Sequence, residues 1–358
     1  MKYLNALNKI NGIGPQKMRL LLSYFSEPEK IWKADFTELA DSKIGYKLAE
    51  KINIERKNID PDTEWEKLQK ENIRMITFEN SDYPLLLKEI THPPYILYIR
   101  GEFNLNSAPM ISIVGSRKYT SYGAQVASTF AKDLSQAGIT IVSGMALGID
   151  SLAHRGALEN GGKTVAVLGN SLDDKNLYPR ANFNLSRDIM ENGMLISDYP
   201  IETPASEFTF PARNRIIAGL SLGTLIIEAG EKSGTLITAE RALEYNREVF
   251  AVPGSIFSLQ SAGTNDLIKK GAKIVTSVKD ILEELDLNER KNPLEKIPKV
   301  PKNSEEEIIL KILSADPIHI DNIVKLSKLN ASAVAATLAI MEIKGWTKNI
   351  GGQNYILL

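Results

Sequence analysis

Short runs of branched apolar residues recur through the middle of the chain, and longer segments with helical spacing separate them. Each run is bounded by glycine, proline or polar residues, which is typical of strands buried on both faces of a parallel sheet. The runs cover residues 111–114, 140–142, 164–168, 195–197, 225–227, 249–252 and 273–275. This alternation predicts an α/β fold with a doubly wound, Rossmann-like sheet and helices on both faces. Ligands of such sheets bind at the carboxyl ends of the strands.

The pattern differs on the amino-terminal side of this region. Residues 1–72 have helical spacing, interrupted by the turn Ile10-Asn-Gly-Ile-Gly-Pro15. The turn resembles a helix-hairpin-helix, in which Gly12 and Gly14 leave backbone N–H groups free for a nucleic-acid phosphate and Lys17 lies nearby. A plain helical hairpin that uses glycine to end a helix explains the same residues equally well. Short apolar runs before residue 102 predict an extension of the sheet, so the α/β domain covers residues 73–285.

The carboxyl-terminal side begins with a polar segment that contains prolines, residues 286–303, which is typical of a linker. Residues 304–358 then show three short helical segments and a final hairpin with Gly351-Gly352 as its turn, the pattern of a winged helix. In its recognition helix, residues 331–344, the spacing turns three apolar side chains inward, and the outward face is nearly uncharged. Such a face suits protein contact, or no contact, better than duplex DNA. The inward residues are Val334, Leu338 and Met341, and the outward ones, apart from alanine, are chiefly Ser332, Thr337, Glu342 and Lys344.

Composition narrows the function further. The chain has 358 residues, a net charge of −1, no cysteine and 3 histidines that lie far apart in sequence. These counts exclude disulfides, thiol nucleophiles and thiolate metal sites, and they argue against a histidine metal site, so we expect no metal and no cofactor. Because the chain as a whole is not basic, a polyanion has to be held by a segregated basic patch. The amino terminus lacks the apolar core of a signal peptide and no apolar run is long enough to span a bilayer, so we expect a cytoplasmic protein with no membrane partner.

Glycine, hydroxyl and basic residues follow four of the predicted strands. Because the carboxyl ends of parallel strands meet at one edge of the sheet, we expect these residues to converge on one basic cleft. Backbone N–H groups at turns and helix starts, together with guanidinium groups, suit a phosphate. The predicted phosphate ligands are Gly115, Ser116, Arg117, Arg180, Arg213, Asn214, Arg215, Lys232, Ser233, Gly234 and Thr235.

Two pairs of neighbouring residues leave alternatives open. Arg213 and Arg215 lie about 200° apart around a helix, so we expect one to contact the anion and the other to brace the fold, for example through Glu228. Asp150 and His154 lie one turn apart on one helix face. They could perform acid–base chemistry, but no serine or cysteine nucleophile is related to them, and a structural hydrogen bond between them explains the pair better.

Together these segments closely resemble the DNA-processing protein A (DprA/Smf) family over essentially the whole chain. The matching motifs include Ile113-Val-Gly-Ser-Arg117, Val252-Pro-Gly254 and residues 143–154, 210–221 and 228–238. The resemblance implies a protein that binds and protects single-stranded DNA in a basic pocket of its extended Rossmann domain. It also implies that the protein helps load the RecA recombinase during natural transformation and recombination, without a reaction of its own. A homodimer is implied as well, for which Leu267 and Ile268 are the candidate contacts.

The alternative function is that of a nucleotide-binding enzyme that resembles the lysine-decarboxylase-like phosphoribohydrolases. Those proteins grip a nucleoside monophosphate with a similar sheet and a loop that contains paired glycines. Here the corresponding loop, Glu231-Lys-Ser-Gly-Thr235, lacks the paired glycines, and no clear catalytic carboxylate faces it. A third class, a sequence-specific regulator that acts through the winged helix, would need base-reading side chains on the recognition helix.

Overall fold

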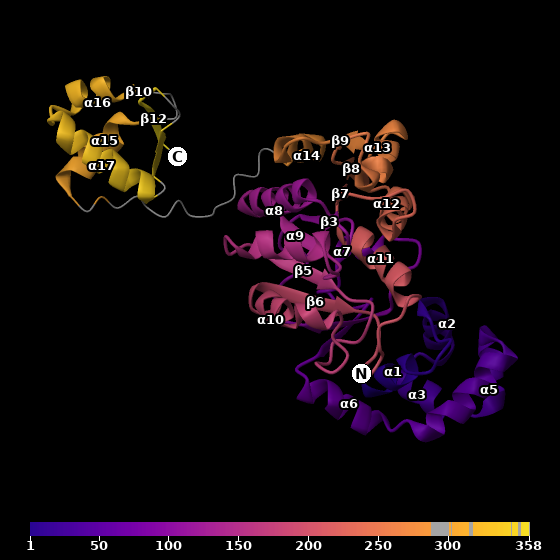
Figure 1. Ribbon diagram of the computed structural model, residues 1–358. Helices are drawn as coiled ribbons and strands as arrows, with labels where there is room; N and C mark the ends of the chain where they lie inside the picture. The colour runs from indigo at the N-terminus through magenta and orange to yellow at the C-terminus, as the bar shows by residue number, and fades with distance from the viewer. Residues whose placement is uncertain (288–300, 302, 315–317, 345, 350–351, 358) are drawn as a thin grey trace. The chain divides into compact units, whose positions relative to one another are not determined.

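The computed structural model describes residues 1–287, 301, 303–314, 318–344, 346–349 and 352–357. By its internal contacts the chain divides into two compact units, Met1–Lys291 and Asn292–Leu358 (Figure 1). Nearly all of the predicted linker, 286–303, and Gly351 of the predicted hairpin turn lie outside the described residues.

A nine-stranded sheet forms the centre of the first unit, in the order β1-β2-β6-β5-β4-β3-β7-β8-β9. The strands from β6 to β9 in this order pair in parallel, and β1 and β2 extend the sheet at one edge in antiparallel pairing. The predicted doubly wound sheet and its extension are therefore confirmed. The strands are β1 (Arg74–Thr77), β2 (Ile96–Arg100), β3 (Met110–Val114), β4 (Thr140–Ser143), β5 (Thr164–Val167), β6 (Gly193–Ser197), β7 (Gly223–Ile226), β8 (Glu248–Ala251) and β9 (Lys273–Ile274).

Helices cover both faces of this sheet (Figure 1). Successive residues of a strand point to opposite faces, and so Ile113 packs with α8 and α9 while Val114 packs with α11 and α12. Both faces are apolar, which explains why the strands lack alternation in the sequence. The helices that accompany the sheet are α7 (Leu85–Lys88), α8 (Ser121–Gln136), α9 (Ile149–Leu158), α10 (Phe183–Asn192), α11 (Thr209–Leu220), α12 (Gly234–Glu244), α13 (Ala262–Lys269) and α14 (Val278–Glu284).

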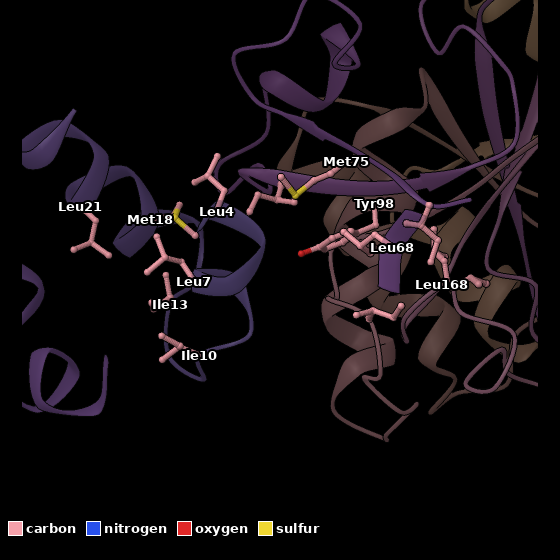
Figure 2. Packing of buried hydrophobic residues seen from close by; sticks show 14 of the residues in the cluster. Leu4, Leu7, Ile10, Ile13, Met18, Leu21, Leu68, Met75, Tyr98 and Leu168 are labelled. Carbon is pink, nitrogen blue, oxygen red and sulfur yellow. The ribbon is translucent and has the colours of Figure 1, made fainter. Parts of the chain in front are cut away.

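The amino-terminal helices share a hydrophobic core with one edge of the sheet. Figure 2 shows Leu7 and Met18 from the helices and Met75 and Tyr98 from the strands, all members of one buried cluster. The Tyr98 hydroxyl donates to Asn5 Oδ1 at 2.8 Å, and burial raises the pKa of this phenol. Packing therefore shows no break at the predicted boundary between residues 72 and 73. These helices are α1 (Lys2–Asn8), α2 (Pro15–Phe25), α3 (Pro28–Lys33), α4 (Phe36–Leu39), α5 (Tyr46–Glu55) and α6 (Pro61–Lys70).

The second unit is a winged helix, as predicted. Its three-stranded sheet has the order β10-β12-β11, and both pairings are antiparallel. Val334, Leu338 and Met341 are fully buried against the other two helices, which confirms the predicted inward face. The elements are α15 (Ser304–Ile312), β10 (Ile318–His319), α16 (Ile320–Ser327), α17 (Ala331–Ile343), β11 (Thr347–Asn349) and β12 (Asn354–Leu357).

The outward face of α17 differs from the prediction at one residue. Thr337 is only 2% exposed, and its hydroxyl donates to Glu305 Oε2 at 3.4 Å, so its predicted outward position is wrong. Lys344, which follows the helix, pairs with Glu306 and lies over the Trp346 ring. Both residues are used inside the winged helix, so the face of α17 is even less suited to reading DNA than the sequence suggests.

Of the helices within the described ranges, none has by itself the length and hydropathy of a membrane span; one pair, Ile320–Ser327 with Ala331–Glu342, bent by 113°, reaches both only when joined.

Candidate nucleic-acid interface

A cleft of about 440 Å³ opens where β3 and β7 end and α11 and α12 begin. It brings together nine of the predicted phosphate ligands, which come from three separate segments of the chain. Its lining contains four cations and one carboxylate, so its charge is opposite to the slight negative charge of the whole chain. The predicted ligands that line it are Gly115, Ser116, Arg117, Arg213, Asn214, Lys232, Ser233, Gly234 and Thr235.

The loop after β3 forms one wall of the cleft. A Cβ atom on Gly115 would lie 2.7 Å from Ile149 Cγ1, so only glycine lets α9 pack this close to the loop. The Ser116 hydroxyl donates to Lys118 O at 2.8 Å and accepts from Lys118 N at 3.0 Å, which closes a tight turn. Arg117 is exposed and lies over the Phe210 ring, 5.4 Å from its centroid. The turn therefore presents a guanidinium group to the cleft from a fixed backbone.

The start of α12 forms the opposite wall. The hydroxyl of Ser233 caps the helix by accepting from Thr235 N at 3.3 Å, and the exposed Lys232 precedes it. Backbone N–H groups in the first turn of a helix carry partial positive charge and bind anions. Asn214 reaches across from α11 and donates to Gly234 O at 3.4 Å. The loop after β3 and the start of α12 thus each bring an exposed cation to the lining of the cleft.

Arg213 forms the floor of the cleft and is only 4% exposed. Its Nη1 donates to Gly144 O at 2.7 Å and also to Val167 O, so it ties the ends of β4 and β5 to α11. Asp150 lies close enough to attract the guanidinium, and it accepts from Gly144 N at 3.1 Å and from Ala146 N at 3.4 Å. Burial lowers the pKa of Arg213 to about 10 and raises the pKa of Asp150. Arg213 therefore stays charged at neutral pH while its donors are used by the fold.

Two predicted ligands lie outside the lining of this cleft. Arg215 pairs with Asp198 and donates to His92 O at 2.9 Å, which places it on the side of α11 away from Arg213. Arg180 donates to Asp174 O at 2.7 Å and lies over the Phe183 ring at 4.4 Å. The opposed directions of Arg213 and Arg215 agree with the helical geometry. Both arginines, however, brace the fold.

Two predicted pairings are wrong. Glu228 accepts from the backbone N and the hydroxyl of Thr120, at 2.9 and 2.5 Å, and so holds the residue that caps α8 in place of pairing with an arginine. His154 Nδ1 lies 2.6 Å from Thr164 Oγ1, and no hydrogen bond joins it to Asp150 in the described structure. Burial lowers the pKa of His154 to about 3, so the imidazole is neutral at physiological pH. Asp150 and His154 therefore do not form an acid–base couple.

An aromatic rim beside the cleft was missed by the sequence reasoning. Tyr178 and Leu147 there are 46% and 48% exposed. The rings of Tyr178 and Phe210 lie 5.8 Å apart, and together with Arg117 and Leu147 they line a small hollow that adjoins the cleft. The sequence signal was present, since Phe210 precedes the Pro211-Ala-Arg213 segment, but an apolar residue there reads equally well as packing for a helix start.

The remaining predicted contacts lie elsewhere in the first unit. Gly12, with φ +102, and Gly14 form the turn between α1 and α2, and the half-buried Lys17 follows in α2. Leu267 and Ile268 lie on α13 and are both half-buried, with Leu267 packed against the sheet core. Each predicted contact is thus partly open to solvent.

Three sequence models match the chain in the order that the fold predicts. The model of the DNA recombination-mediator protein A family covers residues 74–286, more than half of the chain. A SAM-like helix-hairpin-helix tandem matches residues 4–58, and the DprA winged helix domain matches residues 295–353.

Relatives and solved structures agree with these models. Protein Smf of Synechocystis is 34% identical over 390 residues, covering 99% of this chain and 98% of its own. The DNA processing protein DprA of Bacillus subtilis is 42% identical and covers 61% of this chain and 73% of its own. The crystal structure of DprA from Streptococcus pneumoniae covers 79% of this chain and 98% of its own, with 36% identity and a TM-score of 0.69.

A second solved structure, DNA processing protein A from Helicobacter pylori, is described by its single-stranded DNA binding mode. It is 33% identical and covers 59% of this chain and 95% of its own, with a TM-score of 0.54. The fold, the order of the domains and these relatives agree, and the chain belongs to the DNA recombination-mediator protein A family, which contains the DprA and Smf proteins.

Proposed function

We propose that this protein binds single-stranded DNA in the cleft between β3, α11 and α12, and that it protects the strand and helps load the RecA recombinase. The observation that carries the proposal is the arrangement of Arg117 and Lys232 on opposite walls, exposed and outside the ion pairs of the described structure. Cations that have no carboxylate partner are available to a phosphate backbone, and releasing counterions from DNA favours their binding. The related Helicobacter pylori protein, described by its single-stranded DNA binding mode, supports the same choice of ligand.

The aromatic rim suits the bases of a single strand. Unpaired bases stack on exposed aromatic side chains without a requirement for a particular sequence. Tyr178, at 46% exposed, and Phe210 line a hollow together with Arg117, so a backbone in the cleft would bring its bases toward their rings. A duplex hides its bases in the helix and could use only the cations. The site therefore favours a single strand over a duplex.

The same geometry argues against a phosphoribohydrolase-like enzyme. Asp150 is the carboxylate that lines the cleft, and its Oδ2 accepts from two backbone N–H groups below the floor. His154 is buried and neutral, with its Nδ1 bonded to Thr164. A general base must reach the proton that it abstracts, and these two side chains are committed to the fold.

The test compares ligands by thermal stabilisation and by gel shift. A short oligothymidylate should raise the melting temperature, because a ligand that binds only the folded state stabilises it, whereas AMP should not. In the gel shift, single-stranded DNA should bind more tightly than the duplex, and raising the salt concentration should weaken both. Stabilisation by AMP without stabilisation by the oligonucleotide would favour the enzyme.

The winged helix has an accessory role in this proposal. Removal of residues 304–358 should leave the affinity for single-stranded DNA within about threefold, less than roughly 0.7 kcal/mol. The reason is that α17 presents mainly alanine and the apolar Ile340, while Lys344 and Thr337 are held by Glu306 and Glu305. A filter-binding titration of the truncated and full-length proteins measures the difference. Loss of most of the affinity, or binding of a duplex by the isolated winged helix, would contradict the accessory role.

The location and the assembly follow from the same proposal. Loading RecA onto a bound strand takes place on DNA inside the cell, so we propose a cytoplasmic location. We also propose a homodimer through α13, where Leu267 and Ile268 remain half-exposed and available for an isologous contact. Sedimentation at micromolar concentration should show a dimer, and a monomer would count against this contact.

A further inference from the structure

A pattern of three residues occurs twice in the amino-terminal helices, each time just before a helix. Gly12, with φ +102, Ile13 and Gly14 precede α2, and Lys43, with φ +62, Ile44 and Gly45 precede α5. Both isoleucines are buried, at 5% and 3% exposed, and the glycine that follows each of them, Gly14 or Gly45, is the residue before the helix. The second turn was not recognised in the sequence because a lysine stands where the first turn has glycine.

The two turns meet in one groove of about 550 Å³. A Cβ atom on Gly12 would lie 3.3 Å from Leu48 Cδ1, which shows how closely the first turn approaches α5. The groove holds three lysines and no acidic residue. Its lining residues are Asn11, Gly12, Lys17, Ile44, Gly45, Tyr46, Lys47, Leu48 and Lys51.

These lysines differ from most of their neighbours in having few partners. Elsewhere in the same helices, Lys2 pairs with Asp62 at 2.7 Å and Lys33 pairs with Glu29 at 2.6 Å. Within the described residues, Lys17 and Lys47 make no ion pair, and Lys51 has a weak one, 3.6 Å from Glu55. Three ammonium groups around a groove repel one another, and an anion bound between them offsets this repulsion. Tyr46, which is 67% exposed, adds a flat surface at the edge.

We propose that this groove is a second DNA site, in which Lys17, Lys47 and Lys51 hold phosphates of the nucleic acid whose other part lies in the sheet cleft. The inference rests on the proposed function for its choice of DNA as the polyanion. Lysine contacts phosphate as a point charge and reads no base, so the groove binds without regard to sequence. It therefore acts on DNA that is long enough to reach beyond the cleft.

The test is the charge-reversal variant Lys17→Glu/Lys47→Glu in the full-length chain. Lys57→Glu/Lys70→Glu is the matched control, because these lysines lie in the same helical segment, are exposed, and lie outside the groove. Affinities are measured for a short oligothymidylate, a long oligothymidylate and a duplex. We expect the groove variant to bind the long strand, the duplex or both about tenfold more weakly than the control does, with a smaller salt slope, while the short strand binds as it does to the control. The control should change all three by the same small factor.

The two proposals fail in different ways. If the groove variant matches the control on every DNA while the wild type binds all of them, the groove site is overturned and the cleft is unaffected. If the wild type binds no DNA, the proposed function is wrong and the groove proposal falls with it. Lys17→Gln/Lys47→Gln serves as the second variant should charge reversal disturb folding, and unchanged long-strand and duplex binding by it would also overturn the groove site.

Discussion

The Arg213→Met variant should lose about 3–5 kcal/mol of the free energy of unfolding, because removing one partner of a buried charge pair leaves the other uncompensated. In the native protein the guanidinium satisfies Gly144 O and Val167 O and attracts the buried carboxylate of Asp150. Methionine fills much of the volume but donates no hydrogen bond. Both carbonyl oxygens would lose their donor, and the Asp150 carboxylate would lose the nearby positive charge that attracts it.

Urea denaturation measures this loss, and Arg241→Met is the matched control. Arg241 pairs with Glu244 on the exposed surface of α12, where an ion pair contributes less than about 1 kcal/mol. Asp150→Asn in the Arg213→Met background should cost less than in the wild type, since the uncompensated charge has gone. If Arg213→Met were as stable as the control variant, the bracing role of Arg213 would be refuted.

The Arg117→Ala/Lys232→Ala variant should bind single-stranded oligothymidylate about 100-fold more weakly, taking about tenfold for each lost phosphate contact. The two cations lie on opposite walls of the cleft and have no carboxylate partner within the described ranges to retain them. The slope of log affinity against log salt should fall by about 1.4, since each single-strand phosphate contributes about 0.7. Folding should be unaffected, because both side chains are exposed.

Fluorescence anisotropy at several salt concentrations measures both quantities. Lys132→Ala/Lys163→Ala is the control, because it removes the same number of positive charges from exposed positions away from the cleft. Lys132 lies on α8, and Lys163 precedes β5, at the amino-terminal end of the strands, whereas the cleft lies at their carboxyl ends. Long-range electrostatics alone would weaken binding equally in the two double variants. Equal affinities would therefore remove the cleft from the proposal.

Much of the cleft could be predicted because it depends on local rules. Buried parallel strands are visible as apolar runs, and their carboxyl ends meet at one edge whatever their order, so Gly115, Ser116, Lys232 and Ser233 could be placed together. The strand order itself did not have to be known. The carboxyl end of a strand fixes where the residues that follow it lie, so these residues could be placed from the strand alone.

The errors concern residues whose partners are distant in sequence. Arg215 is held by Asp198, which follows β6, and Glu228 is held by Thr120, which precedes α8. Helical periodicity gives the direction in which a side chain points from its helix. It does not give the residue of another segment that the side chain contacts. Thr337 shows the same limit, since its burial depends on Glu305 from another helix. The second turn, at Lys43, could not be predicted because lysine rarely adopts a positive φ, so its residue type does not indicate the conformation found here.

The contact between Gly144 and Arg213 also constrains how this protein can change by mutation. A Cβ atom on Gly144 would lie 2.5 Å from Arg213 Nη1, so a chain carrying both a side chain at 144 and arginine at 213 cannot keep this packing. A side chain at position 144 would displace the guanidinium from Gly144 O and Val167 O, so a substitution there should cost stability for the same reason as Arg213→Met. The architecture of the domain thus demands glycine and arginine at these two positions whether or not DNA is bound.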